Sequence, residues 1–263
     1  MIEEYAPNFK KLMDEYPEIR PSITAPDGHI YALPGLETLN QSKNPIIWMN
    51  GIWLENLGIE EKPQTIDEFY ELLVAFKEGD PNQNEEADEI PLTAASIGEL
   101  RNVILPNFGI VQTDGIYEKD GQVEFAFIQE EYKTYLEFLA QLYEEELLDQ
   151  QIFSHTWEQY VAKGSQNQAG IFPTWPIAMV GFEDPTEALN YPVLPAMTSE
   201  TNEQKLVLEM SEIRRGRFAI TSKNEHPEAT MRWIDEVYSE EGSILSRLGV
   251  EGVTWEWIDG EGS

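Results

Sequence analysis

The sequence predicts a globular α/β fold, and three observations support this prediction. The 263 residues are 41% hydrophobic and 11% aromatic, which is enough apolar material to form a buried core. Runs typical of β-strands are interspersed with amphipathic helical segments along the whole chain. The length suits one large domain or two smaller lobes.

The chain is strongly acidic and contains no cysteine. Forty-nine acidic residues against 17 basic ones give a formal net charge of −32. This charge disfavours nucleic acids, anionic membrane surfaces and polyanionic substrates as partners, and it suggests exposure to salt or to alkaline medium. The absence of cysteine excludes disulfides, thiolate metal sites and cysteine catalysis. No signal peptide or membrane-length apolar run is visible, so a secretory interpretation requires that the start was removed.

Four segments in the first third have the pattern of regular elements. Three of them are a helix over residues 1–20, a strand over Ile30–Leu33 that ends at Pro34, and a strand running into a helix over residues 45–58. The fourth is a helix from Ile66, where Thr65 and Glu68 form a capping box at the start. Gly79 ends this helix.

The remaining segments continue the mixture of helices and strands. They are a turn and helix over 94–109, a hairpin over 113–128, a helix with a stripe of tyrosines over 132–143, a helix over 157–162, a strand at Ile171–Phe172, a helix from Pro227, and a short helix followed by a strand with Val253, Trp255 and Trp257 on one side. The tyrosines of the long helix are expected to be core residues.

The most specific chemical signal is the acidic loop over residues 80–92, DPNQNEEADEIPL. Oxygen-bearing side chains stand at every second position and end in an adjacent acidic pair: Asp80, Asn82, Asn84, Glu86, Asp88 and Glu89. Such a loop can surround one hard cation, because Ca²⁺ accepts about 6–8 oxygen ligands with loose angular demands. The match to an EF-hand is partial, since Glu85 and Pro91 stand at its positions six and twelve. A solvated acidic turn is the alternative.

This loop resembles one found in extracellular solute-binding proteins of ABC importers, in the branch of lipoprotein-type and alginate-oligosaccharide binders. Their loop is close to D-P-N-G-N-G-x-x-D-E-I-P-L and holds a structural Ca²⁺, so the resemblance implies Ca²⁺ as a cofactor here, with Glu86 contributing its backbone carbonyl. Gln83 and Glu85 replace two glycines of that pattern. Other segments also match the family, among them DGHIYALP at 27–34, residues 117–149, and NEHPEATMRWIDEVYSEEG at 224–242. The resemblance also implies a strand over residues 190–197 and the strand of the return crossing over residues 208–221.

The resemblance implies a type II, periplasmic-binding-protein-like two-lobe fold, with one lobe nearly whole and the other partial. Residues 1–35 are then a partial first lobe with a hinge strand, 36–215 the second α/β lobe, and 216–263 the return hinge and a further part of the first lobe. Family members usually begin with a lipobox signal and a first lobe, and they continue beyond residue 263. The chain is therefore expected to be incomplete at both ends.

The resemblance also implies a function without catalysis. The protein is expected to be an extracellular, monomeric substrate-binding component that captures an oligosaccharide or similar polar solute and delivers it to an ABC permease. The full-length protein would be lipid-anchored to the cell membrane. The implied ligand-binding residues are Trp175, Arg101, Asn102 and Arg217. An aromatic face such as that of Trp175 can stack on the apolar C–H side of a sugar, although a buried tryptophan is the alternative.

Arg217 belongs to a cluster of three arginines around Gly216, whose guanidinium groups could contact ligand hydroxyls or a carboxylate. Pairing with local carboxylates is the alternative. Two other functions stay open: a glycan-acting enzyme, and a Ca²⁺-stabilised structural or adhesion module. So many acidic residues give a carboxylate pair no diagnostic value. The three histidines, His29, His155 and His226, have no metalloprotease or triad context.

Overall fold

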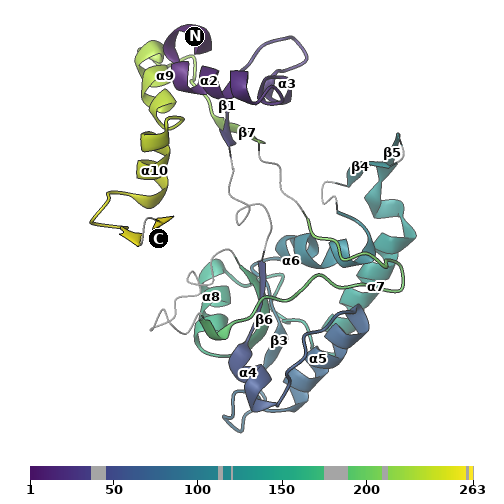
Figure 1. Ribbon diagram of the computed structural model, residues 1–263. Coiled ribbons are helices and arrows are strands. Elements are labelled where there is room, and N and C mark those ends of the chain that lie inside the picture. The colour runs from purple at the N-terminus through teal and green to yellow at the C-terminus, as the bar shows by residue number, and fades with distance from the viewer. Residues whose placement is uncertain are drawn as a thin grey trace. The chain divides into compact units, whose positions relative to one another are not determined.

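The computed structural model describes residues 1–36, 46–111, 115–119, 121–174, 189–208, 213–258 and 261–262. The chain divides into two compact units, drawn in Figure 1. Unit 1 is Met1–Thr38 with Ser211–Ser263, and unit 2 is the continuous stretch Leu39–Met210. The lobe boundaries at residues 35 and 215 that the resemblance implies stay a prediction.

A three-stranded sheet forms the centre of unit 2. Its order is β2 (Ile46–Met49), β6 (Ala169–Thr174) and β3 (Ile90–Leu92). Strand β6 runs antiparallel to β2 and parallel to β3. All six residues of β6 are buried, as expected of a central strand. The strand is longer than the predicted Ile171–Phe172 and includes Pro173.

Helices surround this sheet in Figure 1. They are α4 (Gly51–Asn56), α5 (Ile66–Glu78), α6 (Ile97–Ile104), α7 (Glu130–Glu144) and α8 (Trp157–Ser165), with the 3₁₀ turns η2 (Leu105–Phe108) and η3 (Ala126–Ile128). A hairpin of β4 (Ile116–Lys119) and β5 (Gln122–Phe125) precedes α7. The predicted helices and this hairpin are confirmed, each with slightly different bounds.

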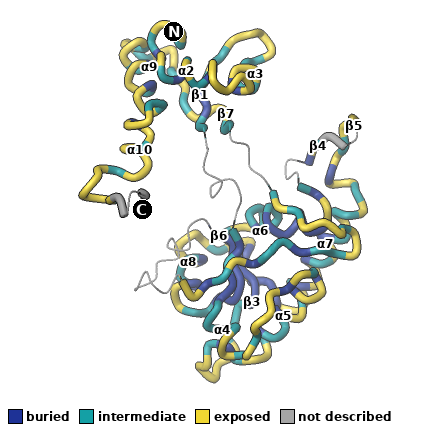
Figure 2. The backbone as a smooth tube through the Cα atoms, viewed as in Figure 1, coloured by how far each residue is buried: buried dark blue, intermediate teal, exposed yellow. Residues whose placement is uncertain are grey.

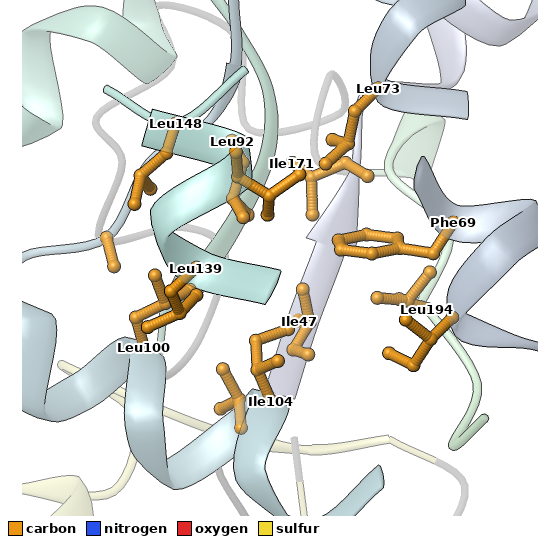
Figure 3. Close-up of a cluster of buried hydrophobic side chains, with 14 of the residues drawn as sticks. Ile47, Phe69, Leu73, Leu92, Leu100, Ile104, Leu139, Leu148, Ile171 and Leu194 are labelled. Carbon is orange, nitrogen blue, oxygen red and sulfur yellow. The ribbon is translucent and has the colours of Figure 1, made fainter. Parts of the chain in front are cut away.

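The core of unit 2 lies between these helices and the sheet. Figure 3 shows Phe69 and Leu73 of α5 close to Ile171 of β6, and Figure 2 shows the buried positions concentrated at β3 and β6. Trp53 of α4 packs edge-to-face on Phe76 of α5, with ring centroids 5.2 Å apart. A Cβ at Gly170 would lie 2.5 Å from a Phe76 ring carbon, so only glycine fits there.

Unit 1 contains a two-stranded antiparallel sheet and several short helices. Its elements are α1 (Ile2–Tyr5), α2 (Pro7–Glu15), α3 (Ile19–Ile23), β1 (Leu33–Leu36), β7 (Ile213–Phe218), α9 (Pro227–Glu236), α10 (Glu240–Leu248), β8 (Trp257–Ile258) and β9 (Glu261–Gly262). Strand β1 pairs with β7, and Leu33 lies opposite Phe218. Asp235 of α9 caps α2, because its carboxylate accepts the backbone N–H groups of Asn8 at 3.1 Å and Phe9 at 2.9 Å. This contact joins α2 to α9.

Three sequence predictions for unit 1 are wrong in detail. The helix over residues 1–20 is broken between α1 and α2, where Ala6 leaves the helical conformation and Pro7 starts the next helix. Strand β1 lies three residues later than predicted and includes Pro34, which a two-stranded sheet tolerates because each strand has an outer edge. The predicted strand with Val253, Trp255 and Trp257 on one side is reduced to β8, because residues 252–254 form a turn in which Gly252 has a φ of +75°.

The stretch over residues 190–197 also differs from its prediction. It has one isolated bridge, between Val193 and Trp48, and no strand of its own. Among the residues that the structure describes, no helix is both long enough and apolar enough to span a membrane.

Candidate functional site

The acidic loop lies between the end of α5 and the start of β3. Gly79 caps α5, and Asn56 of α4 donates a 2.8 Å hydrogen bond to the carbonyl of Pro81. Asp80, Gln83 and Glu85 all have positive φ, at 46°, 59° and 62°. Gln83 and Glu85 stand where the resembled pattern has glycine, so the same left-handed turns form here without it, at a cost in backbone strain.

Hydrogen bonds within the loop bring four of the predicted metal ligands together. The Asp80 carboxylate accepts the backbone N–H groups of Asn84 at 3.1 Å and Glu85 at 3.3 Å. One carboxylate oxygen of Asp88, Oδ1, accepts the side-chain amides of Asn82 at 3.0 Å and Asn84 at 2.9 Å. The side chains of Asp80, Asn82, Asn84 and Asp88 are therefore neighbours in one small loop.

Glu89 has the least favourable environment of the six residues. Its Oε1 atom is buried and has no hydrogen-bond partner in the described part of the chain. Burial raises the pKa of Glu89, and the carboxylates of Asp88 and Asp80 raise it further. The amides of Asn84 and Gln168, by contrast, hold the pKa of Asp88 below its usual value. A carboxylate with one buried, unpartnered oxygen, whose pKa is raised by burial and by two neighbouring carboxylates, is a group that a bound cation would stabilise.

The donor set fits Ca²⁺, although its carboxylates alone do not form a metal cluster. In the described ranges, no three His, Cys, Asp or Glu side chains are grouped to hold an ion. The loop mixes carboxylates with the amide oxygens of Asn82 and Asn84, which are also hard oxygen ligands. The Glu86 side chain is exposed, and its backbone N–H donates to Asn84 Oδ1 at 2.8 Å. Its carbonyl is the donor that the resemblance implies.

Helix α6 positions two of the predicted ligand-binding residues. Ser96 caps the helix by accepting the N–H of Glu99 at 3.1 Å, and the Glu99 carboxylate accepts the N–H of Ala95 at 3.0 Å. Arg101 and Asn102 follow within the next turn and are both half-buried. Arg101 and Asn102 are thus adjacent residues on a helix whose N-terminus is capped by Ser96 and Glu99.

Arg101 lies beside an aromatic ring that the sequence analysis did not single out. The centre of its guanidinium is 5.8 Å from the ring centroid of Phe127 in η3. The Arg101 Nε atom is buried and has no hydrogen-bond partner among the described residues. Phe127 also contacts Tyr132, with ring centroids 4.9 Å apart, and it keeps 37% of its surface exposed. The hairpin predicted over residues 113–128 contains Phe127, but no sequence signal indicates that its ring lies beside Arg101.

The other two predicted ligand residues are Arg217 and Trp175. Arg217 lies on β7 in unit 1 and is exposed. It lines a cavity of ≈ 810 Å³ with, among others, Leu12, Ile19, Leu36, Phe218 and Ile234. Trp175 lies outside the described residues.

Unit 2 contains a buried polar network that the sequence analysis missed. Lys163 Nζ donates to Asp149 Oδ2 at 2.6 Å and to His155 Nδ1 at 3.2 Å. The hydroxyl of Thr93, which follows β3, donates to the same Asp149 oxygen at 2.6 Å. His155 Nε2 is 2.9 Å from the carbonyl of Ala94, and because a carbonyl can only accept, Nε2 carries the proton. His155 is thus a fully bonded structural residue.

Comparison with known proteins identifies the family. A sequence profile of the bacterial extracellular solute-binding protein family matches residues 4–244. The chain belongs to this family. Among curated solute-binding proteins, the fructooligosaccharide ABC transporter substrate-binding protein FusA of Streptococcus pneumoniae serotype 4 (strain ATCC BAA-334 / TIGR4) is 37% identical over 264 residues, covering 96% of this chain and 48% of FusA. Lipoprotein LipO of Bacillus subtilis (strain 168) is 33% identical over 120 residues, covering 43% of this chain and 23% of LipO.

Solved structures of solute-binding proteins share the fold. FusA in complex with kestose superposes with a TM-score of 0.80 at 35% identity, covering 98% of this chain and 55% of that one. The alginate-binding protein AlgQ2 without calcium ion gives 0.82 at 25% identity, covering 100% and 54%. The type II, periplasmic-binding-protein-like fold is thereby confirmed. The chain spans about half the length of these relatives.

Proposed function

We propose that this chain is part of the substrate-binding component of an ABC importer and that its ligand is an oligosaccharide. The observation that carries the proposal is the 37% identity to FusA over 96% of the chain. FusA is a fructooligosaccharide-binding protein, and one of its solved complexes contains kestose. Short fructans are therefore the first ligands to test.

The surroundings of Arg101 support a carbohydrate ligand. Its buried Nε lacks a hydrogen-bond partner in the described ranges, and the half-exposed Phe127 ring lies beside its guanidinium. A sugar offers an apolar C–H face that suits an aromatic ring, together with hydroxyl oxygens that suit an N–H donor. We propose that Arg101, Asn102 and Phe127 contact the ligand, with Trp175 and Arg217 as further contacts.

We also propose that the loop over residues 80–89 binds one structural Ca²⁺. Asp80, Asn82, Asn84, Asp88 and Glu89 would hold it through side-chain oxygens, and Glu86 through its carbonyl. The unpartnered, buried oxygen of Glu89 supports this assignment. The descriptions of two solved relatives refer to an EF-hand or to calcium: one is an EF-hand mutant of FusA, and the other is AlgQ2 without calcium ion. When bound, the ion neutralises the carboxylates and fixes the loop.

The remaining parts of the proposal follow from family membership. The extracellular family and the similarity to a lipoprotein support a protein that acts outside the cell, anchored to its membrane. Its partner would be a membrane permease, to which the protein would deliver the ligand as a monomer. No chemical change in the sugar is part of this function.

Calorimetric titration tests the proposal directly. Kestose and fructo-nystose are titrated into the protein in CaCl₂, with laminaribiose and maltose as comparison sugars, and the mixture is then analysed by chromatography. We expect saturable binding of the fructans with no change in sugar length. Ligand at about 100 times Kd should stabilise the fold by about 2.7 kcal/mol. Absence of binding to every sugar would contradict the proposal, and shortened sugars would indicate a glycan-acting enzyme.

A further inference from the structure

Gln168 contacts the acidic loop from a distant part of the sequence. It stands between α8 and β6, 80 residues after Asp88, and its side-chain amide donates a 3.0 Å hydrogen bond to Asp88 Oδ2. Its carbonyl accepts the backbone N–H of Ile90 at 2.9 Å. One residue thus bonds to the chain on both sides of Glu89, through its side chain on one side and through its main chain on the other.

The turn that presents Gln168 is fixed by the core. Its neighbour Asn167 has a φ of +57°, and the Asn167 side-chain oxygen accepts hydrogen bonds from Asn50 at 2.8 Å and from the indole of Trp53 at 3.0 Å. Both donors are fully buried. Gly170 follows, packed so closely on Phe76 and Trp53 that no side chain fits. The backbone of Gln168 therefore has little freedom to move relative to the sheet.

The two oxygens of Asp88 face different partners as a result. Oδ2 is held by Gln168, whereas Oδ1 points to Asn82 and Asn84 on the side of the loop that carries the other predicted ligands. Without the Gln168 bond, the half-exposed Asp88 carboxylate would be held by two amides of the loop itself and could move with them, so more rotamer freedom would be lost on binding a cation. The bond from Gln168 removes that freedom beforehand, which lowers the entropic cost of binding.

We infer that Gln168 is a positioning residue for the cation loop: its amide orients the Asp88 carboxylate toward the ligand side and thereby sets the affinity for Ca²⁺. The inference rests on the proposed Ca²⁺ site. Groups that orient a ligand in this way typically change metal affinity about 10- to 100-fold when they are replaced. Gln168 matches no position of the loop pattern, so only the fold reveals it.

The test measures Ca²⁺ binding directly, by titrating CaCl₂ into chelator-treated protein. Gln168→Met keeps the length of the side chain but removes the donor, and Gln168→Ala is the second variant. The matched control is Gln166→Ala, an exposed glutamine two residues earlier. We expect both Gln168 variants to weaken Ca²⁺ binding by about 10-fold or more, and the control to bind like the wild type.

Thermal unfolding in chelator separates positioning from general stability. If Gln168 only supports the fold, its variants lower the melting temperature in chelator but leave the Ca²⁺ affinity unchanged, and that result would overturn the inference. If the wild type shows no Ca²⁺ binding, the proposed Ca²⁺ site fails first. If the wild type binds Ca²⁺ and Gln168→Met binds it with the same affinity, the proposed role of Gln168 is overturned and the proposed Ca²⁺ site is not.

Discussion

Lys163 and Asp149 form an ion pair inside unit 2, with Lys163 Nζ 2.6 Å from Asp149 Oδ2. Only 10% and 3% of the two side chains are exposed. The pair joins α8 to the segment after α7, and Thr93 ties both to the end of β3. Every polar atom of this arrangement that the structure describes has a nearby donor or acceptor, so the pair is a structural element of the lobe.

Removing one partner of this pair should be strongly destabilising. Lys163→Met leaves the Asp149 carboxylate buried without its counter-ion, and we expect a loss of about 3–5 kcal/mol in the free energy of unfolding. Urea denaturation measures this loss. The control is Lys133→Met on the exposed face of α7, where the nearest carboxylates are 3.6 and 3.8 Å away. A loss no larger than that of the control would mean that the buried pair contributes little.

Asp149 also predicts a pH dependence of stability. Burial opposes ionisation of this group, but hydrogen bonds from Lys163, Thr93 and the N–H of Gln151 outweigh burial and hold the pKa of Asp149 below its usual value. The unfolded chain has a pKa of about 3.9 for aspartate. The stabilisation is therefore fully present above about pH 4 and is lost as the pH falls through the lower folded pKa.

Comparison of the wild type with Asp149→Asn tests this pH dependence. The difference in their free energies of unfolding should be largest near neutral pH and should shrink below about pH 4. A difference that stays constant over this range would show that another group carries the pH dependence.

The Ca²⁺ loop predicts a change in thermal stability. The wild type should melt at a higher temperature in CaCl₂ than in chelator, and the double variant Asp80→Ala with Asp88→Ala should lose that difference, because two carboxylate ligands are gone. Differential scanning calorimetry measures both. The control removes two exposed acidic residues of the same unit, Glu60→Ala with Glu61→Ala. A difference that persists in the loop variant would contradict the site.

The backbone of the loop gives a prediction that does not depend on the metal. Glu85 has a φ of +62°, which costs a non-glycine residue about 1–2 kcal/mol. Glycine avoids this strain but loses about 0.5–1 kcal/mol through its freedom in the unfolded chain. We therefore expect Glu85→Gly to stabilise the chelated protein by about 0.5–1 kcal/mol. Glu86→Gly, at a position without positive φ, should destabilise it in the same denaturation assay.

The Arg101 region predicts the effects of variants on sugar binding. Phe127→Ala removes the ring beside Arg101 and should weaken fructan binding by about 10-fold, equivalent to about 1.4 kcal/mol. Calorimetric titration measures the affinity. Phe153→Ala, which removes a more exposed ring near Tyr143, is the control. Equal affinities in the two variants would place Phe127 outside the ligand site. Trp175→Ala should likewise reduce binding while leaving the melting temperature nearly unchanged.

The sequence predicted the helices best, because their ends carry local signals. Thr65 accepts the N–H of Glu68 as the capping box requires, although the Glu68 carboxylate returns to the N–H of Gln64 instead. Pro227 starts α9 as predicted. The strand predictions were less accurate, because the sequence of a short apolar run does not indicate which strand it pairs with. The extent of β6 follows from its two neighbours, β2 and β3, which lie far away in the sequence.

The residues of the candidate sites also differ in how well the sequence predicts them. The acidic loop could be found from its spacing, since all six residues lie within ten positions of each other. The roles of Gln168 and Phe127 could not be found from spacing, because only the fold brings Gln168 to Asp88 and Phe127 to Arg101. The same holds for Lys163 of α8 and Asp149 of the segment after α7, which are 14 residues apart. Sequence patterns suggest ligands within one loop, whereas groups that orient those ligands come from elsewhere.

The pairing of β1 with β7 has a consequence for how the protein is made. Leu33 lies opposite Phe218, so unit 1 cannot form its sheet until the ribosome has delivered residues that follow the whole of unit 2. Unit 2 is continuous and can complete its sheet once β6 has emerged. Contacts between distant positions form slowly, because long loops must close first. We therefore expect unit 2 to fold first during synthesis, before α2 can pack on α9.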